Sequence, residues 1–387
     1  MKKFVFTIGF CFILFNLFSQ KIIVGAERFK FYSSMLEGKS VAVLTNQTGR
    51  IGNENLVDFL HDNKVQIVTI FSPEHGFRGT ADAGEKVDNS VDAKTGISIQ
   101  SLYGGNAEKS MDSIIQNIDV LVFDLQDVGL RYYTYLTTMV HAMNVCAHHN
   151  KKMLVLDRPN PNGFYVDGPV LDMKLKSGVG ILPIPVVHGM TLGELALMTN
   201  GEKWLKNGAK CDLTVVPCLN YTHKMHYNLP VPPSPNLPNM RSVYLYPSLC
   251  YFEATPVSLG RGTDAPFQQF GNPQMTAYSY SFTPRSVSGA KNPPQLNQLC
   301  YGVNLQTKPA DKVIFKKGVD LSYLIEAYQN MNMGDKFFNP FFEKLIGVAY
   351  VRKMIIEGKS ASEIKARWKE DVRNFKKLRK PYLLYPE

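Results

Sequence analysis

One short segment concentrates side chains that could do chemistry. Residues 72–79, with the sequence SPEHGFRG, follow the β-branched run 65–71, which is typical of a buried strand. The proline and the glycines predict a turn after that strand. Glu74 and His75 are therefore candidates for proton transfer, and Arg78 could hold an anion. From these eight residues alone, a tight turn with a solvated glutamate and a histidine that caps a carbonyl explains the pattern equally well.

Polar side chains also follow the other predicted strands of the N-terminal half. Those strands are expected at 40–46, 119–125, 152–156 and 213–217. The polar residues at strand ends are Asn46, Gln126, Asp127, Asp157, Arg158, Asn160 and His188. Because the carboxyl ends of parallel strands lie at one edge of a sheet, we expect these groups to converge there. That convergence predicts a ligand site more strongly than any single motif does.

Three functions fit such a site. Glycoside hydrolysis needs a protonated carboxylic acid, for which Glu74 is the candidate, and a second group, for which Asp127 is the best carboxylate. Metal-assisted hydrolysis would use ligands that lack a recognised spacing, namely His75, Asp127, Asp157 and His188. Pure ligand binding in an exported solute-binding protein needs the same crevice without an acid. Asp127 could instead cap a helix that opens near Arg131.

Two further segments have side chains that suit a sugar site. Arg131, Tyr132 and Tyr133 open an expected helix, and tyrosine rings stack on sugar faces while arginine binds carboxylates in a bidentate manner. Arg261 lies between two glycines, which would allow the backbone to approach a ligand closely. The tyrosines could equally be core residues with tethered hydroxyls, and the Gly-Arg-Gly segment could be a plain turn.

The alternation of strands and helices predicts an α/β fold. The expected helices are 54–62 with Asn53 as its cap, 108–117, 131–149, and one from the Thr191–Glu194 capping box to about Trp204. Eight repeats are not visible, so we expect a Rossmann-like open, mostly parallel sheet with helices on both faces, and not a barrel. The chain contains neither GxGxxG nor GxxxxGK[ST], so it lacks the signature of dinucleotide or P-loop nucleotide binding.

The pattern of predicted strands and helices changes near residue 270. Strands are expected within 275–282 and 298–316, and helices within 319–380, of which the last is strongly basic. We therefore expect a catalytic domain over 21–269 and a smaller C-terminal α+β domain over 270–387 that closes the cleft.

The N-terminus predicts export. Lys2 and Lys3 precede the uncharged apolar run 4–18, so residues 1–20 are interpreted as a signal peptide. The mature protein would be periplasmic or extracellular, without a membrane anchor. Losing the two lysines lowers the formal net charge from +10 to +8, which suits an anionic partner such as cell-wall polymer. Nucleic acid is not expected as a partner, because no basic stripe is interleaved with aromatic residues.

The cysteines predict neither disulfides nor a metal. The mature chain would keep an odd number of them, Cys146, Cys211, Cys218, Cys250 and Cys300. Cys211 and Cys218 flank a predicted strand, and an extended segment of that length holds its ends roughly 23 Å apart, beyond disulfide reach. We expect buried free thiols, and no metal or other cofactor, because zinc-ligand spacing is missing as well.

Several of these segments, taken together and in order, resemble one protein family. They are 44–49 (LTNQTG), 71–79, 124–135 (DLQDVGLRYYTY), 156–161, 188–195 (HGMTLGEL), 234–238 (SPNLP) and 260–267 (GRGTDAPF). The pattern looks like that of the exo-β-N-acetylmuramidases of the NamZ type, formerly a family of unknown function. The resemblance runs from about residue 22 to the C-terminus.

The resemblance implies a secreted or periplasmic glycosidase that releases N-acetylmuramic acid from the non-reducing end of peptidoglycan fragments. It also implies a Rossmann-like domain, a smaller C-terminal domain and a site in the cleft between them. The catalytic glutamate of the family corresponds to Glu74 by its SPEHG context. Within this interpretation His75 orients the acid or holds substrate, and Asn236 and Thr263 join the substrate-binding candidates through their motifs.

The substrate implied by the resemblance carries a lactyl carboxylate, so an arginine is expected in the sugar pocket. Arg131, Arg261 and Arg78 are the candidates. The chain departs from the family pattern at Ala254 and Pro256, where a glycine and a polar residue are expected. A retaining, an inverting and a substrate-assisted mechanism all stay open, and so does the oligomeric state.

Overall fold

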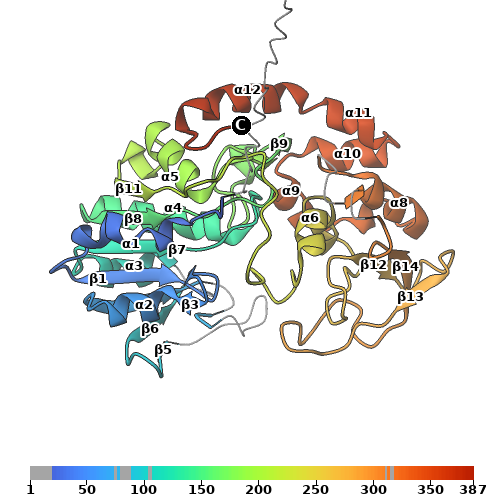
Figure 1. Ribbon diagram of the computed structural model, residues 1–387. Coiled ribbons are helices and arrows are strands. Elements are labelled where there is room, and N and C mark those ends of the chain that lie inside the picture. Colours follow the sequence, from blue (N-terminus) through green and yellow to red (C-terminus); the bar gives the residue numbers. More distant parts are fainter. Residues whose placement is uncertain (1–19, 74–75, 79–88, 103–106, 310–311, 314–317) are drawn as a thin grey trace, which may run out of the picture.

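The structure is a computed structural model that describes residues 20–73, 76–78, 89–102, 107–309, 312–313 and 318–387. Its main feature is a seven-stranded sheet in the order β11-β8-β7-β1-β4-β6-β5 (Figure 1). All neighbouring pairs are parallel except β5–β6. The strands are β1 (Val41–Thr45), β4 (Ile67–Ser72), β5 (Ser90–Val91), β6 (Ser98–Ser101), β7 (Val120–Asp124), β8 (Lys152–Leu156) and β11 (Asp212–Val216). The predicted Rossmann-like sheet is confirmed.

Alternation along the strands builds a core on each face of this sheet. In β1, Val41 and Val43 belong to one buried cluster, whereas Ala42 and Leu44 belong to the other. This division follows because successive side chains of a strand point to opposite faces. Helices α1 (Phe29–Tyr32) and α2 (Leu56–Asp62) contribute to the first cluster, and α3 (Ala107–Ile115), α4 (Thr134–His148) and α5 (Leu192–Gly201) contribute to the second.

Two helix starts differ from the prediction. Helix α2 begins at Leu56, because residues 50–55 form the short hairpin β2 (Arg50–Ile51) and β3 (Glu54–Asn55), and the cap is Asn55, whose side chain accepts from the Val57 amide. Helix α4 begins at Thr134, and not at Arg131. The amide of Arg131 donates to the carbonyl of Val186, which keeps this segment out of the helix.

Other predicted features are confirmed. The capping box of α5 is present, with the Thr191 hydroxyl accepting from the Glu194 amide and the Glu194 carboxylate accepting from the Thr191 amide, although the helix ends at Gly201 and not near Trp204. The five cysteines among the described residues are free and buried. Within the described part of the chain, no helix combines the length and hydropathy needed to cross a bilayer.

The C-terminal part of the chain forms a second, smaller domain, drawn in orange and red in Figure 1. It contains an antiparallel sheet in the order β12-β14-β13, with β12 (Gln269–Asn272), β13 (Tyr280–Phe282) and β14 (Cys300–Asn304). Its helices are α8 (Ser322–Met331), α9 (Phe341–Ile346), α10 (Tyr350–Ile356), α11 (Ala361–Ala366) and α12 (Lys369–Arg379). Helix α6 (Met240–Leu249) precedes them, and α12 packs against the hairpin of β9 (Asp167–Val170) and β10 (Pro185–Val187).

Candidate active site

The topology defines where a ligand is expected. If the six parallel strands are numbered along the chain, their spatial order is 3-2-1-4-5-6, and the order reverses between β1 and β7. In such sheets ligands bind outside the carboxyl ends of the strands at the reversal point. Asn46 follows β1 there, and Gln126 and Asp127 follow β7. The chain also leaves this edge after β4, at Ser72 and Pro73.

Glu74 and His75 lie outside the described residues, so the structure describes only their flanks. On the N-terminal side, Ser72 pairs with Ser101 of β6 and its carbonyl accepts from the Leu102 amide. On the other side, the Gly76 amide donates to the Pro73 carbonyl over 3.2 Å. The segment that contains both candidates is therefore bounded by residues that belong to the carboxyl edge of the sheet.

The polar residues after β1 and β7 bind mainly to one another. The Asn46 Oδ1 atom accepts from the amide and the hydroxyl of Thr48, and its Nδ2 donates to the Tyr135 hydroxyl over 2.6 Å. The Gln126 amide donates to the Thr48 hydroxyl oxygen, and its side-chain Nε2 donates to the carbonyls of Asp127 and Pro159. These bonds fix the two loops relative to each other, so Asn46 and Gln126 shape the edge of the sheet.

Asp127 is a buried carboxyl group, and one of its two oxygens has no hydrogen-bond partner among the described residues. Its Oδ1 accepts from the Gly129 amide over 2.5 Å, whereas its Oδ2 has no hydrogen-bond partner among the described residues. Burial raises the pKa of Asp127 from an ordinary 3.8 to about 7, although backbone amides of the following loop oppose the shift. Asp127 thus caps the loop that precedes α4, and not the helix itself, and it is poised to exchange a proton near neutral pH.

The loop geometry depends on Gly129. Its φ of 81° is in the left-handed region, and a Cβ atom there would lie 2.0 Å from the Asn160 Oδ1. Close packing of the loops after β7 and β8 therefore requires glycine at this position.

The raised pKa of Asp127 predicts a specific dependence of stability on pH. As pH rises from about 4 to about 7 the unfolded state loses this proton and the folded state keeps it, so the free energy of unfolding should fall. The contribution is on the order of 4 kcal/mol and levels off above about pH 7. In Asp127→Asn this component of the slope should vanish, as measured by urea unfolding across that range. Parallel slopes for the two proteins would contradict the assignment.

The polar residues after β8 are also engaged in structure. The Arg158 guanidinium forms a bidentate pair with the fully buried Asp124, at 2.5 and 2.8 Å.

Asp157 accepts from the Thr191 hydroxyl, the Gly193 amide and the Tyr385 hydroxyl, and thereby anchors the start of α5 and the C-terminal segment. Burial raises the pKa of Asp157 to about 6 despite these donors. Asn160 Nδ2 donates to the Met190 carbonyl.

His188 is buried in the same region. Its Nδ1 accepts from the Met190 amide, and burial together with the nearby Arg379 lowers its pKa to about 3, so the ring is neutral. The metal set proposed from the sequence is not gathered within the described residues, because Asp127, Asp157 and His188 do not share a group of ligand atoms there. The fourth member, His75, lies outside them.

Arg131 does not face a ligand site. Its side chain is fully buried, and its guanidinium donates to the carbonyls of Pro169, Ile184 and Leu345 at 2.8, 3.2 and 2.7 Å. Leu345 belongs to α9, so Arg131 joins the parallel-sheet part of the chain to the C-terminal part. Because the Arg131 guanidinium is bound to these carbonyls, Arg261 and Arg78 are the two candidates that remain for the lactyl carboxylate.

Four of the predicted residues line one cavity of about 280 Å³: Tyr132, Tyr133, Asn236 and Arg261. The Tyr132 hydroxyl donates to the Tyr246 carbonyl and that of Tyr133 donates to the Pro233 carbonyl, so both side chains are held in the wall of the cavity. Other lining residues come from the C-terminal half and include Tyr246, Glu253, Phe267 and Phe341. The loop 232–236 connects this cavity to the carboxyl edge of the sheet, because Gln47 Nε2 donates to the carbonyls of Pro232 and Pro233.

Glu253 holds Arg261 in the wall of this cavity. The Arg261 Nη2 donates to the Glu253 Oε1 over 2.5 Å, and the guanidinium lies 5.0 Å from the centre of the Phe267 ring. Burial lowers the pKa of Arg261, but the Glu253 carboxylate more than offsets this, and the group stays charged. Glu253 was not singled out from the sequence. The sequence feature that could have indicated Glu253 is an acidic residue within the apolar run 249–254.

The remaining candidates lie elsewhere. The Arg78 Nη2 donates to the Asp92 Oδ1 over 2.6 Å, and the guanidinium covers the Phe77 ring at 4.5 Å. Thr263 builds its own loop, with its hydroxyl donating to the Gly260 carbonyl over 2.6 Å. A different cavity of about 500 Å³ includes Arg158 and Arg50 in its lining, but it contains just one of the predicted site residues.

Comparisons with known proteins find matches for both halves of the chain. Residues 41–241 match the family model of the N-terminal domain of exo-β-N-acetylmuramidase NamZ, and residues 244–385 match that of its C-terminal domain. The chain is 36% identical over 378 residues to the peptidoglycan β-N-acetylmuramidase NamZ of Bacillus subtilis strain 168, covering 92% of this chain and 89% of that protein.

Two crystal structures of DUF1343 family proteins from Bacteroides fragilis NCTC 9343 have the same fold. One is 60% identical with a TM-score of 0.87, and the match covers 95% of this chain and all of the other. The second is 28% identical with a TM-score of 0.77, and the match covers 94% of this chain and 99% of the other.

Proposed function

Because the chain belongs to the exo-β-N-acetylmuramidase NamZ family, we propose that it removes N-acetylmuramic acid from the non-reducing end of peptidoglycan fragments. Glu74 is the general acid that protonates the leaving oxygen. The substrate is a saccharide derived from peptidoglycan, as the name of the Bacillus subtilis relative indicates for that protein.

The observation that carries this proposal is the composition of the 280 Å³ cavity. Both matched domains contribute to it, with Tyr133 and Asn236 from the first and Arg261 and Phe267 from the second. Aromatic rings offer apolar surface to a sugar ring, and a guanidinium offers paired donors to a carboxylate. N-acetylmuramic acid combines these two features, since it is a sugar with a lactyl carboxylate.

The second catalytic group decides between three mechanisms. A retaining enzyme places its carboxyl groups about 5 Å apart and an inverting enzyme about 6.5–9.5 Å apart, whereas in a substrate-assisted mechanism the 2-acetamido group attacks. Asp127 is the carboxyl group that we assign to this role, either as the partner of Glu74 or as the group that orients the acetamide. Its buried Oδ2, which has no hydrogen-bond partner among the described residues, and a pKa of about 7 support a function in which it holds or releases a proton.

The anomer that forms first tests the proposal directly. We expect proton NMR of a digest of a chromogenic N-acetylmuraminide to show free N-acetylmuramic acid with one anomer in initial excess, which identifies hydrolysis and its stereochemistry. Turnover should persist after exhaustive chelation, because the mechanism uses carboxyl groups. Binding of the sugar without turnover would favour a solute-binding protein, and loss of turnover on chelation with recovery on metal addition would favour metal-assisted hydrolysis.

A further inference from the structure

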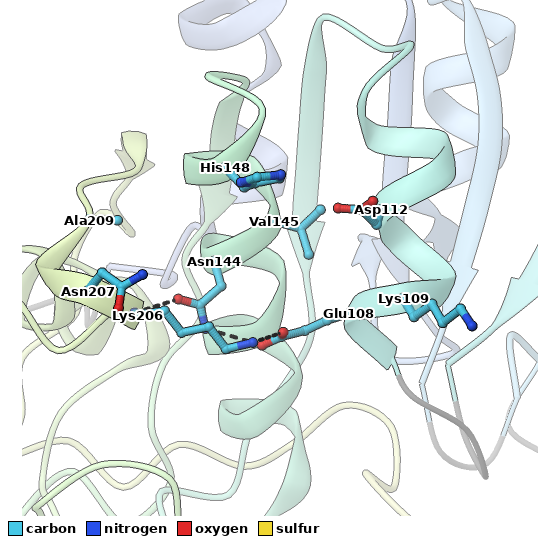
Figure 2. A pocket seen from close by; sticks show the side chains of 9 residues that line it. All are labelled: Glu108, Lys109, Asp112, Asn144, Val145, His148, Lys206, Asn207 and Ala209. Atoms are coloured by element: carbon cyan, nitrogen blue, oxygen red, sulfur yellow. Dashed lines mark hydrogen bonds and ion pairs between the residues drawn. The ribbon is translucent and has the colours of Figure 1, made fainter.

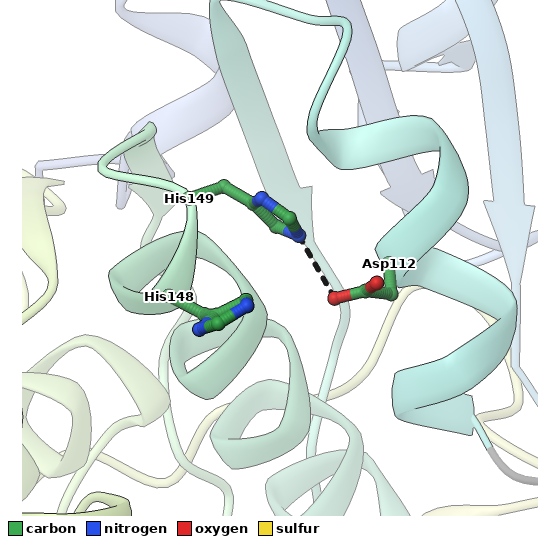
Figure 3. Close-up of side chains that lie close together, drawn as sticks. All are labelled: Asp112, His148 and His149. Atoms are coloured by element: carbon green, nitrogen blue, oxygen red, sulfur yellow. Dashed lines mark hydrogen bonds and ion pairs between the residues drawn. The ribbon is translucent and has the colours of Figure 1, made fainter.

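A group of possible metal ligands lies away from the candidate active site. Helix α4 follows strand β7, so its C-terminal end lies at the opposite, amino edge of the sheet. There His148 and His149 face Asp112 of α3 (Figure 3). The group shares no residue with the cavity that contains Arg261.

The three side chains already converge. The His149 Nε2 atom lies 2.8 Å from the Asp112 Oδ1, and the centres of the two imidazole rings are 4.7 Å apart. One ligand atom from each residue lies within 4.8 Å of the other two. Tetrahedral ligands at about 2.0–2.2 Å from zinc lie about 3.4 Å from one another, so modest side-chain rotation would complete the geometry. His148 is exposed and Asp112 is half-exposed, so both have room to rotate.

The surroundings leave these ligands available. A cavity of about 500 Å³ adjoins the group (Figure 2). Its lining consists of Asp112, His148 and other residues of the same two helices, together with the segment that contains Lys206, Asn207 and Ala209. One helical turn away, Glu108 is already engaged by His141 at 2.7 Å, by Asn144 and by Lys206, so its charge is compensated without a metal. The Asp112 carboxylate pairs with the His149 ring, and a cation between them would keep that attraction.

We propose that Asp112, His148 and His149 bind a late first-row divalent metal ion such as Zn²⁺. Two imidazoles and one carboxylate are typical ligands of these ions, and exposed positions leave the rest of the coordination sphere to water. The ion cross-links α3 to the end of α4. Because it binds the folded state, it stabilises the protein, and its distance from the sheet's carboxyl edge leaves glycoside hydrolysis unaffected.

Metal titration of the untagged mature protein tests this proposal. We expect calorimetry with Zn²⁺, and the absorption spectrum of bound Co²⁺, to show one site per chain. His148→Ala, His149→Ala and Asp112→Asn should each weaken binding about tenfold or more, since the loss of even an outer-shell partner has that effect. The matched control is His61→Ala, because His61 is a surface histidine 3.6 Å from Asp62 that belongs to no three-ligand group within the described residues. Its affinity should equal that of the unmodified protein.

Thermal unfolding supplies a second readout. Saturating Zn²⁺ should raise the Tm of the unmodified protein and of His61→Ala, and should not raise that of His148→Ala, whose exposed side chain can be removed without loss of the fold. Unchanged affinity in all three ligand variants would overturn the proposal, and so would the absence of stoichiometric binding. Neither result bears on hydrolysis, which rests on other residues.

Discussion

Glu74→Gln is expected to abolish release of N-acetylmuramic acid while the protein still folds and binds the sugar. The amide keeps the size and hydrogen-bonding capacity of the side chain but cannot donate a proton to the leaving oxygen. Loss of a general acid lowers the rate by about 10²–10⁴-fold. The measurement is kcat/KM with a disaccharide from peptidoglycan, with circular dichroism and calorimetric sugar binding as checks on fold and affinity.

The leaving group makes this test more specific. A nitrophenolate leaves without protonation, so Glu74→Gln should impair the chromogenic substrate less than the natural disaccharide. A glutamate with a structural role would impair both substrates equally. The matched control is Glu37→Gln, an exposed glutamate of the N-terminal lead-in, which should retain full activity. Near-normal turnover of the disaccharide by the Glu74 variant would refute the assignment.

Arg261→Met is expected to abolish the preference for muramic acid over glucosamine. The two sugars differ by the lactyl ether, so the contribution of its carboxylate appears as a ratio of kcat/KM values. A hydrogen-bonded ion pair contributes about 1.5–3 kcal/mol, so kcat/KM for the N-acetylmuraminide should fall about 10–100-fold. The corresponding N-acetylglucosaminide should change little. The contact with Glu253 uses part of the guanidinium, which has five N–H donors in all.

Two further variants keep this result interpretable. Arg261→Met leaves the Glu253 carboxylate in the cavity without its partner, which could destabilise the protein. The double variant Glu253→Gln/Arg261→Met removes that unpaired charge, so it separates the loss of the sugar contact from a loss of stability. Arg78→Met is the matched comparison, because Arg78 is the other candidate arginine and is bound to Asp92. If the Arg78 variant lost the preference and the Arg261 variant kept it, the carboxylate would have to be assigned to Arg78.

The sequence alone was sufficient to predict the parallel sheet and the edge where its polar residues gather. Strands such as β1 and β7 are fully buried and consist mainly of β-branched and other apolar residues. Such runs can be recognised in the sequence without knowing which strands they pair with. The capping box of α5 was equally local, since its two members are three residues apart. The exact helix starts were not predictable, because the amide of Arg131 finds its acceptor in a strand more than fifty residues away.

The roles of individual polar residues were decided by the tertiary structure. Arg131 and Arg261 both suggested a carboxylate site by their sequence context. Arg131 is bound by the carbonyl of Leu345 in α9, 214 positions away along the chain. Arg261 is held in a cavity wall by Glu253, a residue that belongs to no recognised motif. Asp157 likewise binds the Tyr385 hydroxyl near the end of the chain. Residue type and local pattern determine which chemistry a side chain can perform, whereas burial and distant partners determine whether it is free to perform it.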